Sequence, residues 1–348
     1  MKLNPVTKLR LDRFLSIRRA KLSMIIVVSL IVLSLFAELI ANNKALIVYH
    51  NGKLHFPTYT KVLLGTDFGL DYKYEVEYRE LKQQLKGSTK GWVLMPIIPY
   101  NQFEQDFKDD GTFPPYAPSL KEGHPLGTDR IGRDIFARIF YGFRIAIFFS
   151  LAFVSITTIF GTLVGCLMGY WGGKFDIIVQ RFIEIWERIP FLYMVMISVA
   201  IYQPDMIVFL IIFCVFGWAG KTWTVRAMTY RERERDYILA AKTMGASTWR
   251  IITVHILPNV IVVVVTMLPF AIAGGISSLT ALDYLGFGLR PPAPSWGELL
   301  KQGIATFDDA PWILTSVATA MSLILVMIAF IGEGLREAFD PKKYTVYK

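Results

Sequence analysis

The chain has 348 residues, of which 53% are hydrophobic and only 19% are charged, and its mean hydropathy is +0.43. A soluble domain usually carries about 25% charged residues, and here the apolar residues gather repeatedly into runs of about 20, the length that crosses a bilayer. The composition excludes an ordinary soluble protein and predicts an all-α integral membrane protein. The net charge of +9 gathers in short loops, as in membrane proteins, so no nucleic-acid partner is expected.

Residues 1–23 form a basic head in which apolar and basic residues alternate. This pattern favours a cytoplasmic amphipathic helix at the membrane surface, and a disordered basic tail is the alternative. The first span, 24–41, reaches spanning length and is expected to be a signal anchor rather than a cleaved leader. A long polar segment, 42–138, follows it. Its Gly, Pro and mixed charges predict either a small subdomain of short strands and turns or an ordered strap over the helices.

Five further spans bring the expected number of transmembrane helices to six. They cover 145–170, 177–202, 207–223, 260–282 and 312–331. Lys and Arg concentrate in the head, in the loop after the second span, in the loop at about 224–258 and in the tail, 334–348. Because such residues mark the cytoplasmic side, both termini and the 224–258 loop are expected inside, and the 42–138 segment outside.

The residues that would carry enzyme chemistry are absent or badly spaced. The four histidines are His50, His55, His124 and His255, and they lack the spacing of a metal site. The stretch GWAGKT at 217–222 lacks the first glycine of a phosphate-binding loop and lies in an apolar span. Cys166 and Cys214 lie in apolar runs, which favours two buried thiols over a disulfide or metal pair. We therefore expect no catalytic residue, metal or cofactor in this chain, so its energy comes from an ion gradient or a partner.

The predicted cytoplasmic stretch DYILAAKTMGASTWRIITVHILPN, residues 236–259, is unusually rich in small residues. They are Ala240, Ala241, Gly245 and Ala246. A short helix with so little bulk can fit closely against another protein, and Gly245 can end it at positive φ. Lys242 and Arg250 can then contact an acidic rim, while Pro258 is expected to hold Leu257 extended. From these residues alone, a docking surface and an ordinary tight loop stay equally open.

The same stretch resembles the E-A-A-x3-G-x9-I-x-L-P signature of ABC importer permeases, which forms the coupling helix seated on the ATPase. The residues in register are Ala240, Ala241, Gly245, Leu257 and Pro258. Two positions depart from the signature: Leu239 replaces the glutamate, and His255 stands where isoleucine is usual. The resemblance implies that these residues and Lys242 contact the ATPase, with one polar contact missing at Leu239.

A second block, LGTDRIGRDIFARIFYGFRIAI at 126–147, resembles the lead-in to the second helix in permeases of the dipeptide/oligopeptide/nickel family. The matching residues are Gly127, Asp129, Gly132, Arg133, Asp134, Arg138, Gly142 and Arg144. The Gly and Asp residues suit turns and helix caps, and the Arg138 and Arg144 side chains can bind headgroups or pair with Asp134. Similarity continues to about residue 341, and the outer segment resembles the Yej-type permeases of microcin C and oligopeptide importers.

The resemblance implies a type I, MetI-like ABC importer permease fold, with the permease domain at 139–333. It also implies several partners in a bacterial inner membrane: a homologous second permease, two ABC ATPases or one fused tandem ATPase, and a periplasmic substrate-binding protein. ATP and Mg would bind to the ATPases. The implied cargo is a dipeptide, an oligopeptide or a microcin C-like peptide, with a nickel chelate as the alternative. The rivals from other classes are an ion-coupled secondary transporter and a structural membrane protein.

Charged residues inside the predicted spans are candidates for the pathway. Four of them share a helical stripe near the inner end of the third span: Arg181, Glu184, Glu187 and Arg188. They can pair with one another along the helix or form part of a gate. Asp283, near the outer end of the fifth span, is expected at a solvated helix end or in an outer cavity that meets a peptide amine. Gly274 and Gly275 favour close helix packing, with a hinge as the alternative.

Overall fold

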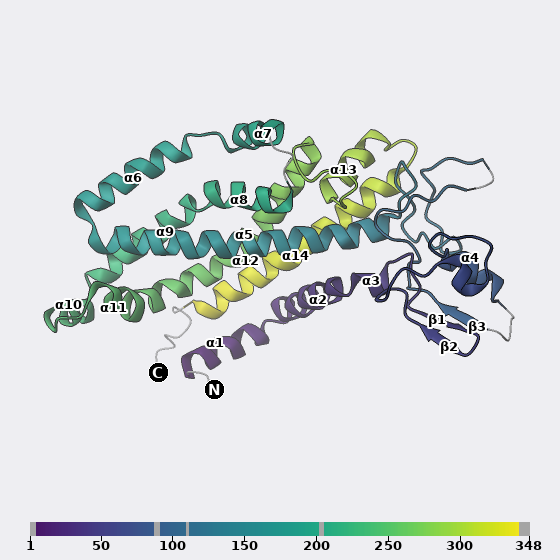
Figure 1. Cartoon of the computed structure of the whole chain (residues 1–348). Helices are drawn as coiled ribbons and strands as arrows, with labels where there is room; N and C mark the ends of the chain where they lie inside the picture. Colours follow the sequence, from purple (N-terminus) through teal and green to yellow (C-terminus); the bar gives the residue numbers. More distant parts are fainter. Residues whose placement is uncertain (1–4, 87–90, 109–110, 202–204, 341–348) are drawn as a thin grey trace.

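A bundle of long helices makes up most of the computed structural model, which describes residues 5–86, 91–108, 111–201 and 205–340 (Figure 1). Within these ranges, four helical stretches are long and apolar enough to cross a membrane. They are Ile135–Trp171, Met206–Arg233, Thr248–Leu285 and Pro311–Phe339. The predicted helical membrane fold is confirmed at this level. The ends of the predicted head, tail and third span, at 1–4, 341–348 and 202, lie outside the described residues.

The head is helical. Helix α1 (Pro5–Ser16) is followed by α2 (Arg18–Leu35) and the short α3 (Ala37–Ile40), so the first apolar helix begins inside the predicted head and bends at Phe36. Phe14 is buried among residues of α2 and α14, and the Arg19 guanidinium lies 3.3 Å from the Glu333 carboxylate of α14. The disordered alternative for the head is therefore wrong within the described residues.

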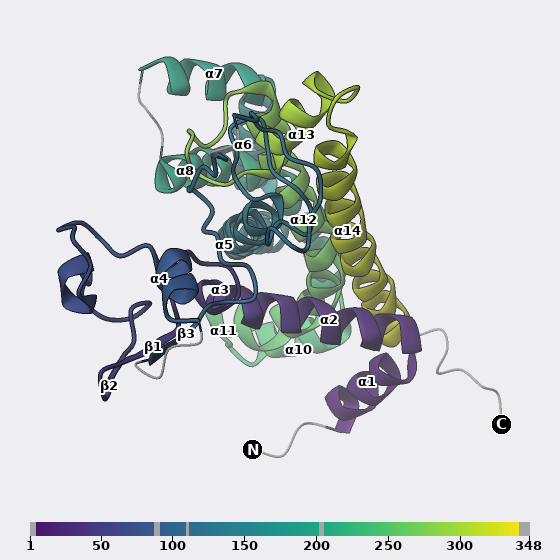
Figure 2. The ribbon, with the colours of Figure 1, turned by 90° about the vertical axis from the view of Figure 1, so that its right-hand side faces the viewer.

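The outer segment contains a small subdomain and a strap. Strands β1 (Ile47–His50), β2 (Lys53–His55) and β3 (Gly91–Leu94) form an antiparallel sheet in the order β2-β1-β3. Asn51 and Gly52 turn the β1–β2 hairpin with positive φ, as two-residue hairpin turns require. The sheet packs with the turn η1 (Gly65–Phe68) and helix α4 (Tyr78–Gln84) around their own core. Figures 1 and 2 show this subdomain beside one end of the bundle, so both expectations for 42–138 hold in part.

Helix α5 (Ile135–Trp171) is the central helix of the bundle and packs along α9 (Ala219–Arg233). It begins at Asp134, whose carboxylate accepts a hydrogen bond from the Ala137 amide at 2.7 Å, the expected cap. Gly161, Gly165 and Gly169 then recur every four residues against α9. A Cβ atom on Gly165 would lie 2.8 Å from the Thr222 carbonyl oxygen, so only glycine permits this approach, as at other small-residue helix contacts in membranes.

The third predicted span is two helices rather than one. Helix α6 (Gly173–Glu187) ends before Pro190, and α7 (Phe191–Ile201) begins after it. Proline has no amide hydrogen and disfavours helical backbone in the residue before it, which accounts for the interruption. The span predicted over 177–202 therefore consists of two helices, which are separated at Pro190.

The remaining helices pass through the end of the bundle farthest from the β-sheet and return to the end near it (Figure 1). Helix α8 (Met206–Gly217) meets α9 at a bend at Trp218, and α10 (Asp236–Thr243), α11 (Thr248–Arg250) and the π-helical turn η2 (Ile251–Ile256) follow. Helices α12 (Leu257–Leu285), α13 (Trp296–Ala305) and α14 (Pro311–Phe339) complete the chain. Leu257 is helical, with φ −55° and ψ −42°, so the extended conformation expected before Pro258 is wrong. Pro258 lies in the first turn of α12, where the missing amide hydrogen is tolerated.

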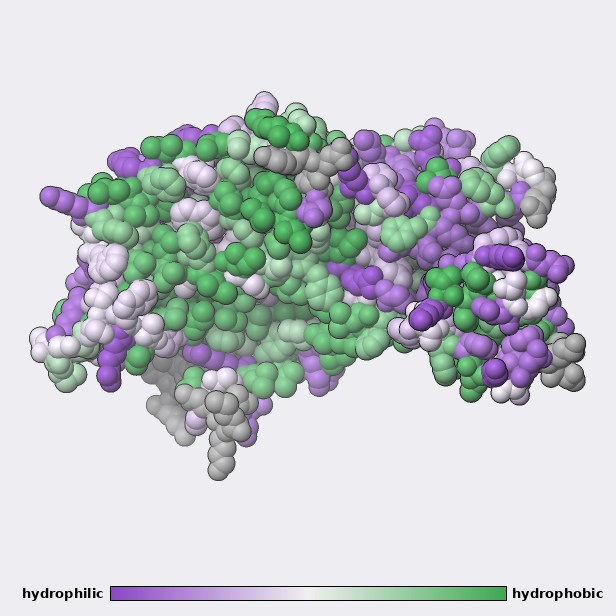
Figure 3. Space-filling view, viewed as in Figure 1, coloured by the Kyte–Doolittle hydropathy of each residue, from purple (hydrophilic) through white to green (hydrophobic). Residues whose placement is uncertain are grey.

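The main core lies between α5, α8, α12, α13 and α14 and consists of apolar side chains. Figure 3 shows a broad apolar surface over the helices and polar residues gathered over the outer subdomain. Gly275 packs, as expected, because a Cβ atom there would lie 3.0 Å from the Ser150 hydroxyl oxygen. A Cβ atom on Gly274 would meet nothing within 4 Å, so the two adjacent glycines differ in what they permit.

This difference gives a test of the α5–α9 contact. Gly165→Leu should lower the free energy of unfolding by at least about 1–3 kcal/mol, the cost of overpacking, because the new side chain would meet the α9 backbone. Gly274→Leu should leave stability nearly unchanged, because that side chain would point into open space. Thermal unfolding of the purified chains in detergent measures both. Equal midpoints for the two variants would contradict the proposed close packing.

Candidate functional site

Helix α10 lies at the end of the bundle farthest from the β-sheet (Figure 1). It ends as predicted at Gly245, where φ is +80°. The Gly245 amide donates to the Lys242 carbonyl and the Ala246 amide donates to the Ala241 carbonyl, both at 3.0 Å. This pair of hydrogen bonds defines a Schellman motif, which needs a left-handed residue at the glycine position. The sequence predicted both the short helix and its end.

The inner face of α10 packs on the rest of the chain. Ile238 and Ala241 are buried in a core shared with Cys166 of α5, Val225 of α9 and Ile256 of η2. Ala241 therefore faces inward and cannot belong to the same exposed surface as Ala240, which corrects the expectation of a single face of small residues.

The Lys242 ammonium also lies against the chain, 5.1 Å from the centre of the Tyr170 ring on α5. This cation–π contact places Lys242 beside α5, whereas the sequence suggested a side chain free to meet an acidic rim. Leu257 packs on the same inner core, and His255 lies on η2 with its carbonyl oxygen accepting a hydrogen bond from Asn259. Pro258 is exposed in the first turn of α12.

The outward surface of α10 is small, exposed and partly apolar. The exposed residues of α10 and of the turn after it include Leu239, Ala240, Met244 and Gly245, which we name the α10 surface. Leu239 is 45% exposed and Met244 is 80% exposed. The side chain that replaces the glutamate of the signature thus points away from the chain. Leu239 and Met244 are thus exposed apolar side chains beside the exposed Ala240 and Gly245, and a contact with another protein there stays a prediction.

A hydrogen-bond cluster that sequence reasoning missed joins α10 to its neighbours. The Asn259 amide group donates to the Glu232 carboxylate at 3.0 Å and to the Tyr237 hydroxyl at 2.9 Å, and the Tyr237 hydroxyl also donates to Glu232. Glu232 belongs to α9, Tyr237 to α10 and Asn259 to α12. The cluster therefore connects three helices. In the sequence, only the position of Asn259 directly after Pro258 of the motif could have drawn attention to it.

The predicted charged stripe on α6 is only partly assembled. Arg181 donates to Glu184 at 2.6 Å, the expected pairing of residues three apart. Glu187 instead accepts from the Trp223 indole of α9 at 3.3 Å, and Arg188 caps the end of α6. Since these side chains lie on the exposed side of the helix or near it, a place in the pathway stays a prediction.

Asp283 is buried, at 9% exposure, so the solvated helix end expected there is wrong. One carboxylate oxygen accepts from the Leu289 amide at 2.7 Å and the other from the Ser295 hydroxyl at 2.5 Å. Buried carboxylates need such partners. Because both donors belong to the segment that follows α12, the two bonds also fix the conformation of that segment. Its contact with a peptide amine stays a prediction, and both oxygens already have donors.

The second motif, at 126–147, forms a buried ion cluster at the outer end of the bundle. Arg133 donates to Asp129 at 2.7 Å and to Glu298 of α13 at 2.8 Å, and Arg138 pairs with the other oxygen of Glu298. Two guanidinium groups and two carboxylates neutralise one another, which makes their burial possible. Arg138 thus pairs with Glu298 rather than with Asp134, because α13 folds back onto the start of α5.

Arg144 also finds a partner that the sequence did not indicate. Its guanidinium lies 2.9 Å from the Glu38 carboxylate of α3, so it joins the first apolar helix to α5. Of the two alternatives expected for Arg144, pairing with Asp134 is therefore wrong, and headgroup binding stays a prediction. The partner is distant in the sequence and could be found only from the packing of α2 and α3 along the bundle.

His124 forms a third polar cluster in the strap. It is fully buried, and its two ring nitrogens lie 2.8 Å from the Asp134 carboxylate and 3.1 Å from the Asp106 carboxylate. Burial alone would lower the pKa of His124, but the hydrogen bonds to the two carboxylates outweigh it and raise the pKa. The hydrogen bond from His124 in turn lowers the pKa of Asp106. In the described ranges, no group of acidic, His or Cys side chains is arranged to hold a metal ion.

This cluster predicts a pH dependence of stability. A raised His124 pKa adds stability that is complete below its ordinary value of 6.5 and is lost as pH rises through the raised value. A lowered Asp106 pKa adds stability above its ordinary value of 3.8 that is lost on acidification through the lowered value. The contribution is therefore greatest between these values.

The thermal unfolding midpoint of the purified chain should decrease as the pH is raised from about 6 to about 9. His124→Gln should have a lower midpoint at pH 6 and a smaller fall over the same interval, because Gln does not titrate. His255→Gln serves as the control, since no carboxylate pairs with His255 among the described residues. An unchanged pH profile in His124→Gln would show that the cluster does not act this way.

The chain is similar to known proteins over the helical bundle and, for two relatives, over nearly its whole length. The family model described as "Binding-protein-dependent transport system inner membrane component" matches residues 161–344. The inner membrane ABC transporter permease protein YejE of Escherichia coli (strain K12) is 40% identical, over 98% of this chain and 99% of its own length. The peptidoglycan transport system permease protein YejE of Agrobacterium fabrum is 35% identical, over 98% and 94%. The dipeptide transport system permease protein DppC of Lactococcus lactis subsp. cremoris is 36% identical, over 64% and 65%.

Proposed function

This chain belongs to the family of binding-protein-dependent transport system inner membrane components, and on that premise we propose that it conducts peptides through an ABC importer. It is a multi-pass permease of the bacterial inner membrane and is not itself catalytic. A binding-protein-dependent ABC system implies an ATPase and a binding protein as partners. We propose in addition a cargo, an arrangement of the partners, and a way in which movement of the ATPase reaches the permease helices.

The proposal of a peptide cargo rests on the cargoes that the names of the relatives state. Those whose names state a cargo are a dipeptide permease, an oligopeptide permease and a peptidoglycan permease. Peptidoglycan contains short peptides, so the three cargoes share peptide chemistry. The match with the two YejE proteins covers the outer segment as well as the bundle, which favours the Yej-type subgroup. A nickel chelate remains the alternative cargo.

The proposed topology has six passages in a type I fold, with the permease domain at 139–333. Helices α2 and α3 form the first passage, and α6 and α7 together form the interrupted third. Helices α10 and α11 and the start of α1 lie toward one end of the bundle, and the sheet subdomain lies at the other (Figure 1). The basic residues near the first end favour a cytoplasmic location for it and for both termini. The 42–138 segment is then periplasmic, where the binding protein would arrive.

The α10 surface is the proposed contact with the ATPase. Two ATPase subunits, or one fused tandem ATPase, would bind ATP and Mg, and a homologous second permease would form the other half of the pathway. Closure of the ATPases would move α10 as a rigid body. Its buried face and the Glu232, Tyr237 and Asn259 cluster would carry that movement to α9 and α12. Coupling of this kind needs rigid elements that move together.

The coupling role is tested by adding bulk to the α10 surface without straining the backbone. Ala240 is exposed in a regular helix, so Ala240→Trp should fold and insert normally. We expect loss of ATPase co-purification and at least about a tenfold fall in uptake, which corresponds to 1.4 kcal/mol of lost coupling. Gly245→Trp should also lower uptake, but it strains the backbone at φ +80° as well, so Ala240→Trp is the decisive variant. Leu239→Glu, which restores the acid of the signature, should keep uptake. Normal uptake by Ala240→Trp would refute the docking surface.

The cargo is tested with the complete complex in proteoliposomes. ATP inside the compartment of the ATPases should drive uptake of labelled dipeptides or longer peptides, and an ion gradient without ATP should not. Uptake of a nickel chelate with no uptake of peptides would replace the proposed cargo. Uptake driven by an ion gradient alone would instead favour a secondary transporter. The binding protein alone, assayed with the same peptides, serves as the control for capture without transport.

A further inference from the structure

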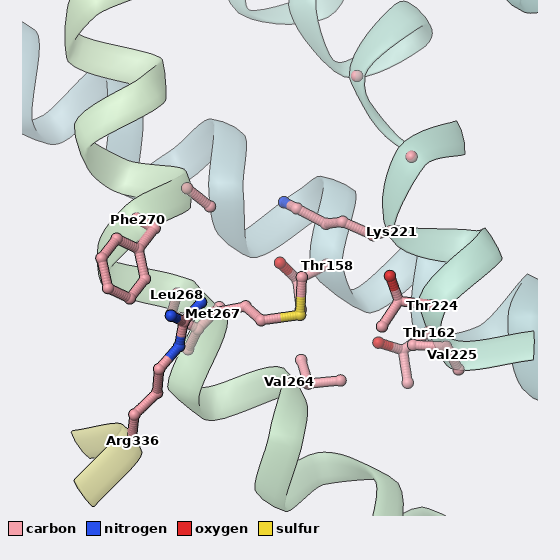
Figure 4. Close-up of a pocket in the computed structure, with 13 residues that line it drawn as sticks. Thr158, Thr162, Lys221, Thr224, Val225, Val264, Met267, Leu268, Phe270 and Arg336 are labelled. Carbon is pink, nitrogen blue, oxygen red and sulfur yellow. The ribbon is translucent and has the colours of Figure 1, made fainter. Parts of the chain in front are cut away.

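A cavity of ≈ 310 Å³ lies between α5, α9, α12 and α14. Most of its wall is apolar and comes from residues such as Val264, Met267 and Leu268 of α12. Two cationic side chains reach it from different helices, Lys221 from α9 and Arg336 from α14 (Figure 4). The described lining contains no Asp or Glu, so the charge of this cavity is positive.

The two cations retain binding capacity. The Lys221 ammonium donates to the Thr157 hydroxyl at 2.5 Å and to the Val154 carbonyl at 3.3 Å, and an ammonium has a third donor to offer. The Arg336 guanidinium carbon lies 4.6 Å from the centre of the Phe270 ring, and in the described ranges no carboxylate forms an ion pair with it. By contrast, Arg226 of α9 is paired with Asp176 at 2.5 Å.

Two hydroxyl groups on the α5 wall also lack partners. Thr158 and Thr162 are one helical turn apart, and neither hydroxyl oxygen has a hydrogen-bond partner although both are buried. Thr162 as a whole is 7% exposed. Their neighbour Thr157 bonds to the Phe153 carbonyl of its own helix at 2.7 Å, which is the usual arrangement. A buried hydroxyl without a partner is unfavourable, so both hydroxyls are available to a ligand in the cavity.

We propose that this cavity is a subsite of the pathway that binds the carboxylate of a passing peptide. The proposal rests on the peptide-conducting function proposed above. Lys221 and Arg336 would bind the carboxylate oxygens, the Thr158 and Thr162 hydroxyls would donate to them, and the apolar wall would take the adjoining side chain. A peptide amine would find no acid here. The volume is at the low end of small-ligand pockets, about 300–1,000 Å³, which suits one end of a peptide.

The cavity is also placed to respond to the ATPase. Val225 and Val264 line it and belong to the core on which Ile238 and Ala241 of α10 pack. A rigid movement of α10 would therefore displace one wall of the cavity. Affinity for the carboxylate would change during the transport cycle, as an importer requires of a site that must bind and then release its cargo.

The experiment compares a peptide that has a free C-terminal carboxylate with the same peptide C-terminally amidated, in the complete complex in proteoliposomes. The wild-type complex should prefer the free peptide. Lys221→Met and Arg336→Met should each raise the uptake KM for the free peptide by about tenfold, the loss expected for one charge-assisted hydrogen bond. The preference for the free peptide should fall by the same factor, and Thr162→Val should show a smaller effect in the same direction.

Lys174→Met is the matched control, because Lys174 is exposed on α6 and outside the cavity, and it should keep both the KM and the preference. Thermal midpoints and ATPase co-purification show that each variant has folded. An unchanged preference in Lys221→Met and Arg336→Met would overturn the subsite and leave the importer intact. Equal losses for free and amidated peptides would also overturn it, and would indicate that the cations hold a lipid phosphate. A wild-type complex that transports neither peptide would overturn the importer proposal as well.

Discussion

The contact between α5 and α9 is the constraint on which the functional parts of this permease depend. Gly161, Gly165 and Gly169 leave three positions on one face of α5 without a side chain, and backbone and side-chain atoms of Trp218 and α9 occupy the space. In a membrane, where lipid tails are as apolar as the protein, such close contact supplies much of the attraction between helices. The consequence is geometric as well as energetic, since it fixes the height and rotation of α9 on α5.

Two features of the site follow from that placement. Lys221, on α9, is brought to the Thr157 hydroxyl of α5, beside the unpaired hydroxyls of Thr158 and Thr162. Farther along the same contact, Val225 and Cys166 form the core on which α10 rests. The proposed carboxylate subsite and the proposed ATPase contact are therefore built on a single helix pair, so a movement of one can reach the other through packed side chains.

The outer end of the bundle is held by charge rather than by small residues. Arg133 and Arg138 share the Glu298 carboxylate, and this fixes α13 across the start of α5. His124 links the strap to the cap of the same helix through Asp134. Ion pairs of this kind contribute little net stability but leave an expensive unpaired charge when broken. They suit a region that keeps one arrangement, as the proposed approach of a binding protein to this end would require.

Features that depend on residues close together in the chain could be predicted from the sequence. Long apolar runs identified the membrane helices, and Gly245 predicted the end of α10, because both depend on residues near one another in the chain. The pairing of Arg138 with Glu298, the inward orientation of Ala241 and the Glu232, Tyr237 and Asn259 cluster could not be read in this way. Each depends on how helices far apart in sequence rotate and pack.

The third span shows that a long apolar run does not by itself predict one uninterrupted helix. Its apolar run predicted one span, and within that span Pro190 separates α6 from α7, since proline lacks the amide hydrogen that a helix needs. The sequence by itself thus determined the class of protein, its membrane runs and the short helix α10 that is proposed to contact the ATPase. Only the tertiary structure decided which side chains face outward and which cations share a cavity, because rotation of each helix is set by the surfaces against which it packs.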